Sequence, residues 1–254
     1  MSEYARAGLV GILPPQSNTT VEAELGVLLA PNVGTIVSRL VCHDDDSRTR
    51  LVGYWLNVEQ SLRAFDTAKP DVVLFACTGS TYLVGLEEER RIFSGRGILS
   101  AAQAVLAALD ALQAKRLALV SPYPAWLTDA CVAFWRSQGR DVVAVQSPAG
   151  DRVDTRRIYS LGSKQALHAL EELDTAAADA VLITGTGMPS LGALARARLE
   201  LPLLSSNLCL AWAAMQQLGK GPLDRASLLP WLSRTAPWHA RLAARFPSIP
   251  GLRS

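Results

Sequence analysis

The sequence predicts an α/β protein made of two pseudo-symmetric lobes, each an open parallel sheet flanked by helices, with the active site in the cleft between them. Short β-rich apolar runs alternate with longer Ala- and Leu-rich stretches of helical period, which is typical of β-α units and a parallel sheet. One stretch of sequence recurs at a fixed offset, which indicates duplication. The 254 residues are 49% hydrophobic and 19% charged, an ordinary composition for a packed globular chain.

The apolar runs and helical stretches define the expected elements in chain order. Strands are expected at residues 9–13, 35–41, 72–76, 116–121, 141–145, 180–184 and 202–205. Helices are expected at residues 20–29, 51–66, 100–113, 124–138, 164–173, 190–200 and 208–218. Ser100 is expected to cap its helix. The proline-rich tail after Leu218 is expected to form short helices that wrap back on the body.

The internal repeat gives the domain organisation. DVVLFACTG at 71–79 aligns with DAVLITGTG at 179–187, an offset of 108 that also places LVGILPP (9–15) over LALVSPY (117–123). Buried parallel strands share Val and Leu by chance, but burial does not require the Thr-Gly that follows both strands. We therefore predict a first lobe of residues 1–98 plus about 208–254, and a second lobe of 99–207.

The carboxyl ends of the strands are the expected place for chemistry. Open α/β sheets bind ligands there, so two such lobes would direct their strand-end loops into one cleft. Those loops, at 14–20, 77–81, 122–123 and 185–188, are rich in hydroxyls, amides and exposed N–H groups but hold no Asp, Glu, Lys or His. Such loops favour an anion, for example a carboxylate, held by neutral donors.

Three residues of these loops are candidates for the chemistry. Cys77 follows a strand and precedes a Gly-containing loop, a position that can lower the pKa of a thiol and so make it a nucleophile or a proton carrier. The alternative is a buried structural cysteine, and the repeat favours the functional reading. Asn18 is either a helix cap or an amide directed into the cleft. Tyr123 either donates to an anion or covers the edge of the core.

Composition and motifs exclude several function classes. A net charge of +2 without clustered Lys or Arg argues against nucleic acid as a partner. The four cysteines form no CxxC pair, which argues against a zinc site or a disulfide framework and favours a reducing cytoplasm. The first residues read as a strand and not as a signal peptide, and no apolar run reaches the ~18 residues that span a bilayer.

Other motifs point the same way. The chain holds no GxSxG, GxGxxG or GxxxxGK[ST] motif, so a Ser-His-Asp hydrolase and dinucleotide or P-loop sites are not expected. The run from His43 to Asp46 reads as a solvated turn and not as a metal site. Cys42, Cys131 and Cys209 are expected in the core. Arg156 and Arg157 could pair with a substrate carboxylate or with surface acids.

Four segments resemble a known family. LPPQSNTTVEAE, VLFACTGSTYLVG, KRLALVSPYPAWL and VLITGTGMPSLGAL resemble the aspartate/glutamate racemase superfamily, in its branch of maleate cis-trans isomerases and arylmalonate decarboxylases. The resemblance covers most of residues 6–218 and implies no cofactor, no metal, one thiol from each lobe and a homo-oligomer. It implies that Asn18 holds a substrate carboxylate, that Cys77 is the thiol of the first lobe, and that Tyr123 donates a hydrogen bond to a carboxylate. It also implies further donors to the substrate at Thr78, Gly79, Thr186 and Gly187, and we expect Gly185 to bind the substrate with them.

The sequence departs from the family pattern at two places. Gly185 stands where the second-lobe cysteine belongs, which argues against a two-base racemase, and Thr155-Arg-Arg157 stands where an isomerase would offer an Asn. Cys77 with Gly185 is also the mirror image of the decarboxylases, whose thiol comes from the second lobe. We therefore expect an isomerase whose substrate is a small carboxylate or dicarboxylate. Its Cys77 would react at a carbon beside a carboxylate group. The alternatives are a single-thiol decarboxylase and a carboxylate-binding protein without turnover.

Overall fold

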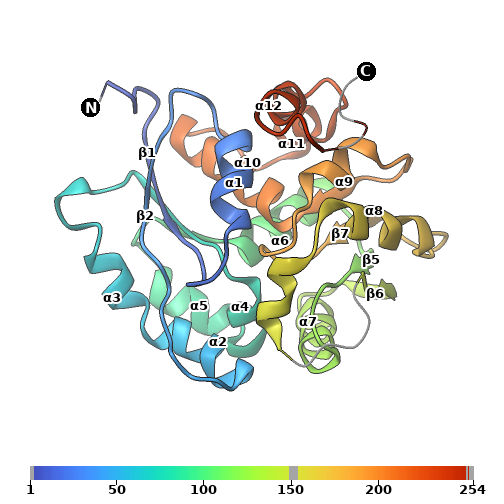
Figure 1. Ribbon diagram of the computed structural model, residues 1–254, viewed down its shortest axis with the longest axis horizontal. Coiled ribbons are helices and arrows are strands. Elements are labelled where there is room, and N and C mark those ends of the chain that lie inside the picture. The colour runs from blue at the N-terminus through green and yellow to red at the C-terminus, as the bar shows by residue number, and fades with distance from the viewer. Residues whose placement is uncertain (1–2, 149–153, 250, 252–254) are drawn as a thin grey trace.

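The chain forms two four-stranded parallel sheets that lie side by side (Figure 1). The computed structural model describes residues 3–148, 154–249 and 251. The first sheet has the order β2-β1-β3-β4 and the second β6-β5-β7-β8, so the predicted pair of similar α/β lobes is confirmed. The strands are β1 (Leu9–Leu13), β2 (Gly34–Val37), β3 (Val72–Phe75), β4 (Ile98–Ser100), β5 (Arg116–Val120), β6 (Asp141–Gln146), β7 (Ala180–Ile183) and β8 (Leu203–Ser205).

Strand register corrects the predicted repeat by one residue. The backbone N–H of Leu9 donates to Asp71 Oδ2 at 2.8 Å, and that of Arg116 donates to Asp179 Oδ2 at 2.8 Å. The two aspartates are 108 positions apart, as predicted, but Leu9 and Arg116 are 107 apart. The offset of 108 is therefore right for β3 and β7 and one residue too long for β1 and β5. Both faces of these strands are covered, so apolar residues run continuously and a one-residue slip leaves the pattern intact.

The helices follow the predicted order, with three short elements added. The predicted helix at 51–66 is two helices, and the first starts at Ser47 because the Asp46 side chain accepts from the N–H of Thr49 at 2.7 Å. Sequence analysis missed β4, α4 and α5, which are only three to eight residues long. The helices of the two lobes are α1 (Thr20–Leu28), α2 (Ser47–Leu56), α3 (Val58–Arg63), α4 (Thr78–Val84), α5 (Leu86–Phe93), α6 (Ala101–Leu112), α7 (Ala125–Ser137), α8 (Ser163–Glu172) and α9 (Leu191–Arg196).

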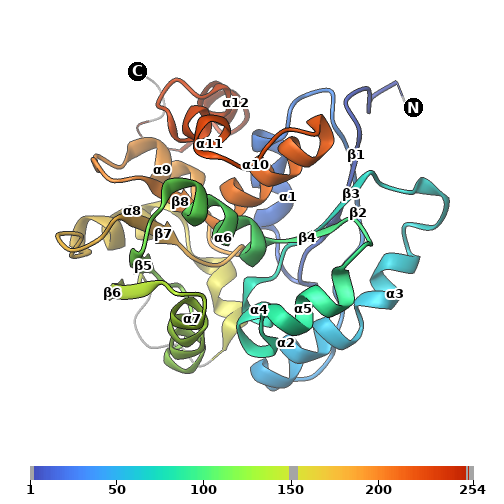
Figure 2. The same cartoon turned by 180° about the vertical axis from the view of Figure 1, so that it is seen from behind.

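Helix α10 (Ser206–Gly219) lies across the junction between the lobes (Figure 2). It contacts β3 and β4 of the first sheet, β8 of the second, and α6, whose predicted cap Ser100 accepts from the N–H of Gln103 at 3.1 Å. Because α10 contacts both sheets, the predicted domain boundary near residue 208 stays a prediction. In the described part of the chain, every helix is too short or too polar to cross a membrane.

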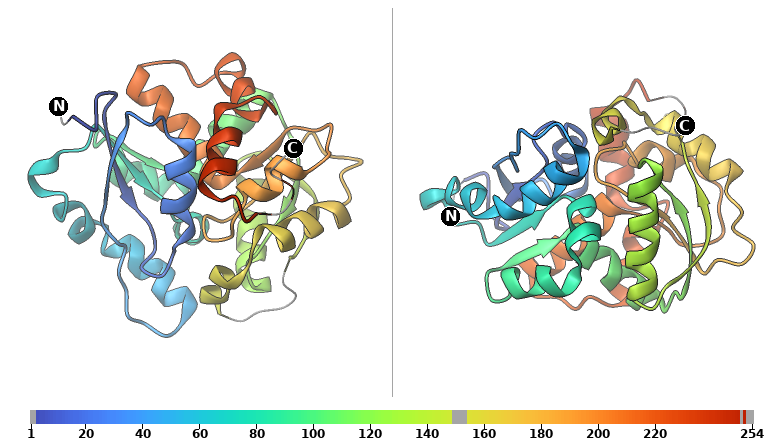
Figure 3. Two further views of the ribbon diagram at one scale, coloured as in Figure 1. Left: turned by 45° about the horizontal axis from the view of Figure 1, so that its top comes forward. Right: turned by 90° about the horizontal axis from the view of Figure 1, so that it is seen from below.

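The proline-rich tail forms α11 (Arg225–Leu232) and α12 (Pro237–Arg245). Helix α12 lies beside α1 (Figure 3). The Arg241 guanidinium donates to the carbonyls of Val27 and Leu28 at 2.6 and 3.0 Å, which satisfies acceptors at the C-terminal end of α1. The predicted wrapping of the tail is confirmed.

A buried carboxylate joins the lobes. Glu24 on α1 is fully buried and accepts from Ser190 Oγ at 2.9 Å, from the N–H of Leu191 at 2.9 Å and from Asn207 Nδ2 at 2.8 Å. Burial raises the pKa of Glu24, and these donors oppose the rise. The donors come from the start of α9 and from α10, so this carboxylate holds the first lobe against the second.

We expect Glu24→Ala to lower the free energy of unfolding by at least about 3 kcal/mol, because several buried donors would lose their acceptor at about 1–3 kcal/mol each. The control is Glu22→Ala on the same helix, which removes a half-exposed ion pair with Arg39 and should cost less than about 1 kcal/mol. Urea unfolding of both variants measures the difference. Equal losses would contradict the role of Glu24 as the tie between lobes.

Candidate active site

A small cavity lies where β1, β3, β5 and β7 end, between the lobes. Its volume of about 30 Å³ has room for one or two water molecules, so a larger ligand must widen it. Among the described residues, its walls include two arginines and no carboxylate. The predicted site residues that line it are Asn18, Cys77, Thr78, Gly79, Tyr123, Thr186 and Gly187.

Cys77 precedes the first turn of α4 and is 4% exposed. Its Sγ lies 3.1 Å from Ser80 Oγ, which itself donates to the carbonyl of Leu51 at 2.7 Å. While the Ser80 proton is donated to Leu51, the neutral thiol donates to Ser80; the thiolate would instead accept that hydroxyl proton. Burial raises the pKa of Cys77, and hydrogen bonds from Ser80 and Gly79 oppose the rise without cancelling it. The expected lowering of this pKa is therefore wrong for the closed cavity, because desolvation outweighs the N–H dipoles.

Asn18 fulfils both of its predicted roles at once. Its Oδ1 accepts from the N–H groups of Thr20 and Val21 at 2.9 and 3.2 Å, which caps α1. Its Nδ2 donates across the junction to Thr186 Oγ1 at 3.2 Å, and Thr186 donates to the carbonyl of Ala76 at 2.8 Å. The cap fixes the side chain, and the amide nitrogen is left to face the cavity and the second lobe.

Tyr123 and Gly185 form one packing unit. The Tyr123 hydroxyl lies 2.6 Å from Thr78 Oγ1, and burial raises its pKa well above the usual value. Gly185 has φ +86°, and a Cβ built on it would lie 3.1 Å from the Tyr123 hydroxyl oxygen and 3.2 Å from Pro122 Cγ. The phenol therefore fills the space beside the glycine. Gly185, predicted to bind substrate, does not line the cavity because Tyr123 and Pro122 crowd its side-chain position.

Sequence analysis named only one residue of one wall of the cavity. Of its two candidate arginines, Arg156 lines the cavity and also pairs with Asp154, whereas Arg157 does not line it. Arg50 and Tyr54 of α2, and Tyr159 of the 3-10 helix η2 (Thr155–Ser160), complete this wall and were missed. The expectation of neutral donors alone is thus wrong, because Arg50 is a cation that is only 2% exposed. A signal was available, since residues 50 and 54 share one helical face, but the predicted helix began at residue 51.

The remaining candidates take structural places. Cys131 and Cys209 are buried in the core as predicted, and burial raises the pKa of Cys131 to about 12. Cys42 is half-buried and packs against the core. Asp46 caps α2, which agrees with the prediction that the run from His43 to Asp46 is a turn. Across residues 3–148, 154–249 and 251, no three His, Cys, Asp or Glu side chains gather as metal ligands would.

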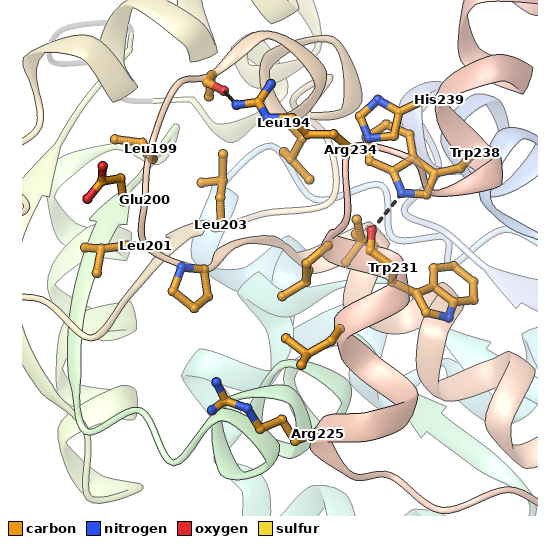
Figure 4. A pocket seen from close by; sticks show the side chains of 15 residues that line it. Leu194, Leu199, Glu200, Leu201, Leu203, Arg225, Trp231, Arg234, Trp238 and His239 are labelled. Atoms are coloured by element: carbon orange, nitrogen blue, oxygen red, sulfur yellow. Dashed lines mark hydrogen bonds between the residues drawn. The ribbon is translucent and has the colours of Figure 1, made fainter.

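A larger cavity of about 400 Å³ lies between α9, β8, α11 and α12 (Figure 4). Arg225, Arg234 and His239 reach it among leucines and two tryptophans. None of the predicted site residues lines it, and it contains no cysteine. We therefore assign the chemistry to the small cavity around Cys77.

The sequence profile of the family described as arylmalonate decarboxylase matches residues 68–227. The chain belongs to the arylmalonate decarboxylase family. Relatives of this family member include the maleate isomerase of Nocardia farcinica, 28% identical over 82% of this chain and 89% of the relative. The crystal structure of the maleate isomerase Iso from Pseudomonas putida S16 has a TM-score of 0.73 and 25% identity, covering 86% of this chain and 98% of that one. The crystal structure of arylmalonate decarboxylase has a TM-score of 0.65 at 21% identity, covering 84% and 94%. The predicted resemblance is confirmed.

In this decarboxylase-family chain, we expect Cys77 to react slowly with iodoacetamide at neutral pH. A raised pKa means that the thiolate fraction is smaller than that of a free cysteine, so the alkylation rate should rise with a midpoint well above ~8.5. Mass spectrometry of the modified peptide across pH measures this midpoint. A midpoint below that of free cysteine would contradict the balance between burial and N–H donors described above.

We expect Gly185→Ala to destabilise the protein by more than Gly139→Ala. Both glycines have positive φ, which costs an L-residue about 1–2 kcal/mol, but a Cβ at Gly139 meets nothing within 4 Å. At Gly185 the crowding against Tyr123 and Pro122 should add about 1–3 kcal/mol. Urea unfolding measures the free energy of unfolding of both variants. Equal losses of stability would mean that the Tyr123 side chain moves aside at no cost.

Proposed function

We propose that the protein is a cofactor-independent isomerase that converts a cis-unsaturated dicarboxylate, maleate or a close analogue, into its trans isomer through Cys77. The observation that carries the proposal is a single buried thiol in a cavity whose walls, as far as residues 3–148 and 154–249 form them, hold two arginines and no carboxylate. Maleate isomerases are among its relatives. A solved variant of the Nocardia farcinica enzyme holds a covalently bound succinylcysteine intermediate, which has the S–C bond of the adduct proposed here and one further proton on the neighbouring carbon.

The reaction begins when the Cys77 thiol releases its proton to solvent and the resulting thiolate adds to one carbon of the double bond. The S–C bond forms, and the π pair moves onto the neighbouring carbon and into its carboxylate, which becomes an enediolate. The former double bond is then single and rotates. The electron pair returns, the S–C bond breaks, and the trans product and the thiolate are released. No substrate carbon gains or loses a proton, so the cycle needs no second thiol and accommodates Gly185.

The groups around Cys77 suit the enediolate. Fixed donors aimed at developing negative charge can lower a barrier by a few kcal/mol. In the ligand-free protein the donors pair with one another, Asn18 with Thr186 and Thr78 with Tyr123. We propose that the carboxylate beside the reacting carbon replaces these mutual hydrogen bonds. The proposed donors are Asn18 Nδ2, the hydroxyls of Thr78, Tyr123 and Thr186, and the backbone N–H groups of Gly79 and Gly187.

A second candidate function is single-thiol decarboxylation of an arylmalonate. It is favoured by the raised pKa of Cys77, because a thiol that is protonated at neutral pH suits a proton donor. In that reaction the C–C bond to one carboxylate breaks and CO₂ leaves. The resulting enediolate takes the thiol proton to form a C–H bond, and solvent then reprotonates the sulfur.

Proton NMR in heavy water separates the candidates. Maleate should become fumarate without deuterium, because addition and elimination move no proton to carbon. Phenylmalonate, if decarboxylated, should give a product with one deuterium at the α-carbon. Binding of maleate without change in either compound would instead indicate a carboxylate-binding protein without turnover and would refute the proposal.

We also propose a cytoplasmic location and association into a homo-oligomer. All four cysteines are free, which is typical of proteins in reducing compartments. The oligomer is what the family resemblance implies.

Replacing the nucleophile should remove activity without removing the fold. Cys77→Ser should lower kcat/KM for maleate by at least about 10³-fold, because a serine hydroxyl is a far weaker nucleophile. The matched control is Cys42→Ser, a half-buried cysteine outside the cavity, which should stay within about two-fold of wild type. Circular dichroism checks that both variants fold. Retained activity in Cys77→Ser would refute the assignment of the thiol.

A further inference from the structure

Two phenol hydroxyls in the active-site cavity have no hydrogen-bond partner. Tyr54 is 3% exposed and Tyr159 packs so closely that a Cβ on Gly187 would lie 2.7 Å from its ring. Both line the cavity, yet neither hydroxyl bonds to any residue in the described part of the chain. Neither oxygen is among the side-chain atoms of the described residues that are closed off without a partner, so both hydroxyls reach the open space of the cavity, where a ligand can supply the acceptor.

The same wall carries positive charge. Arg50 Nη2 lies 3.2 Å from Asp154 Oδ1, and Arg156 Nη2 lies 2.7 Å from Asp154 Oδ2, so two guanidiniums share one partly exposed carboxylate. Asp45 is 3.8 Å from Arg156 but 99% exposed, so water and salt screen it. Both arginines line the cavity, and no acid does in the part of the chain that the structure describes. The wall therefore presents an excess of positive charge to whatever enters.

The Arg50 guanidinium acts on the cavity through its charge. Nη1 already donates to the carbonyls of Asp44 and Asp45 at 2.9 and 3.1 Å. Nη2 already donates to Ser47 Oγ and Asp154 Oδ1 at 3.0 and 3.2 Å. The two phenols can then donate hydrogen bonds to a ligand at this wall, with the fixed cation of Arg50 behind them.

The phenols stay protonated at neutral pH. Burial raises the pKa of Tyr54 and of Tyr159, a charge on Cys77 raises both further, and Arg50 opposes the rise. Both hydroxyls are therefore donors. The influence of Cys77 on both also means that the sulfur lies within electrostatic range of this wall.

We propose that Tyr54, Tyr159 and Arg50 form an anion subsite that receives the second carboxylate of a dicarboxylate substrate. The first carboxylate would lie against Asn18 and Thr186 beside the thiol. The choice of substrate rests on the proposed function, whereas the subsite itself requires only binding. Tyr54 and Arg50 come from the first lobe and Tyr159 from the second, so the subsite is complete only when both lobes meet.

Calorimetric titration with succinate and with butyrate tests the subsite. Both have four carbons and no double bond, so binding is measured without turnover, and only succinate has a second carboxylate. Wild type should bind succinate more tightly than butyrate. Tyr54→Phe and Tyr159→Phe should each weaken succinate binding about 5- to 10-fold, because each loses one hydrogen bond to a charged acceptor. Butyrate binding should stay within two-fold.

Tyr82→Phe is the matched control. Its buried hydroxyl bonds to Thr184 at 2.7 Å and does not line the cavity, so neither dissociation constant should change. Unchanged succinate binding in both cavity variants, or an equal loss for succinate and butyrate, would overturn the subsite. Selective succinate binding by a protein that turns over neither maleate nor phenylmalonate would uphold the subsite and refute the proposed function. Turnover of maleate by wild type, together with unaltered succinate binding in Tyr54→Phe and Tyr159→Phe, would uphold the proposed function and refute the subsite.

Discussion

The junction between the lobes imposes the constraint on which the site depends, because its buried polar groups must find their partners across it. Asn18 reaches Thr186, Thr20 donates to the carbonyl of Gly187 at 2.6 Å, and Glu24 accepts from the start of α9. A buried donor or acceptor without a partner is expensive, so the lobes dock in the one arrangement that satisfies all of them. The strand-end loops are thereby held facing one another.

The thiol illustrates how that docking opposes reactivity. The same burial that brings Cys77 against donors from both lobes also removes water from its sulfur and favours the neutral form. The N–H groups of α4 and the Ser80 hydroxyl reduce this penalty without cancelling it. The charge of Glu89 adds to the rise, so the closed cavity keeps the thiol neutral, and the two arginines that line the cavity are left to act on a bound anion.

Sequence reasoning found the site residues whose place follows from topology. Cys77, Asn18, Tyr123 and Thr186 stand just after strands, and parallel strands end at one edge, so their convergence follows from strand order alone. Arg50 and Tyr159 were missed because they lie on a helix and a 3-10 turn that follow no such rule, and only tertiary docking turns them inward. The β1–β5 register was misjudged for a related reason, since doubly buried strands carry no alternation to fix it.

The packing of Tyr123 against Gly185 has an evolutionary consequence. A cysteine acquired at position 185 would need a backbone that tolerates φ +86° and a phenol that has already moved aside. The two positions are therefore coupled, because a side chain at position 185 strains the backbone and also displaces Tyr123. A second thiol at this place would be accommodated only together with a change at Tyr123.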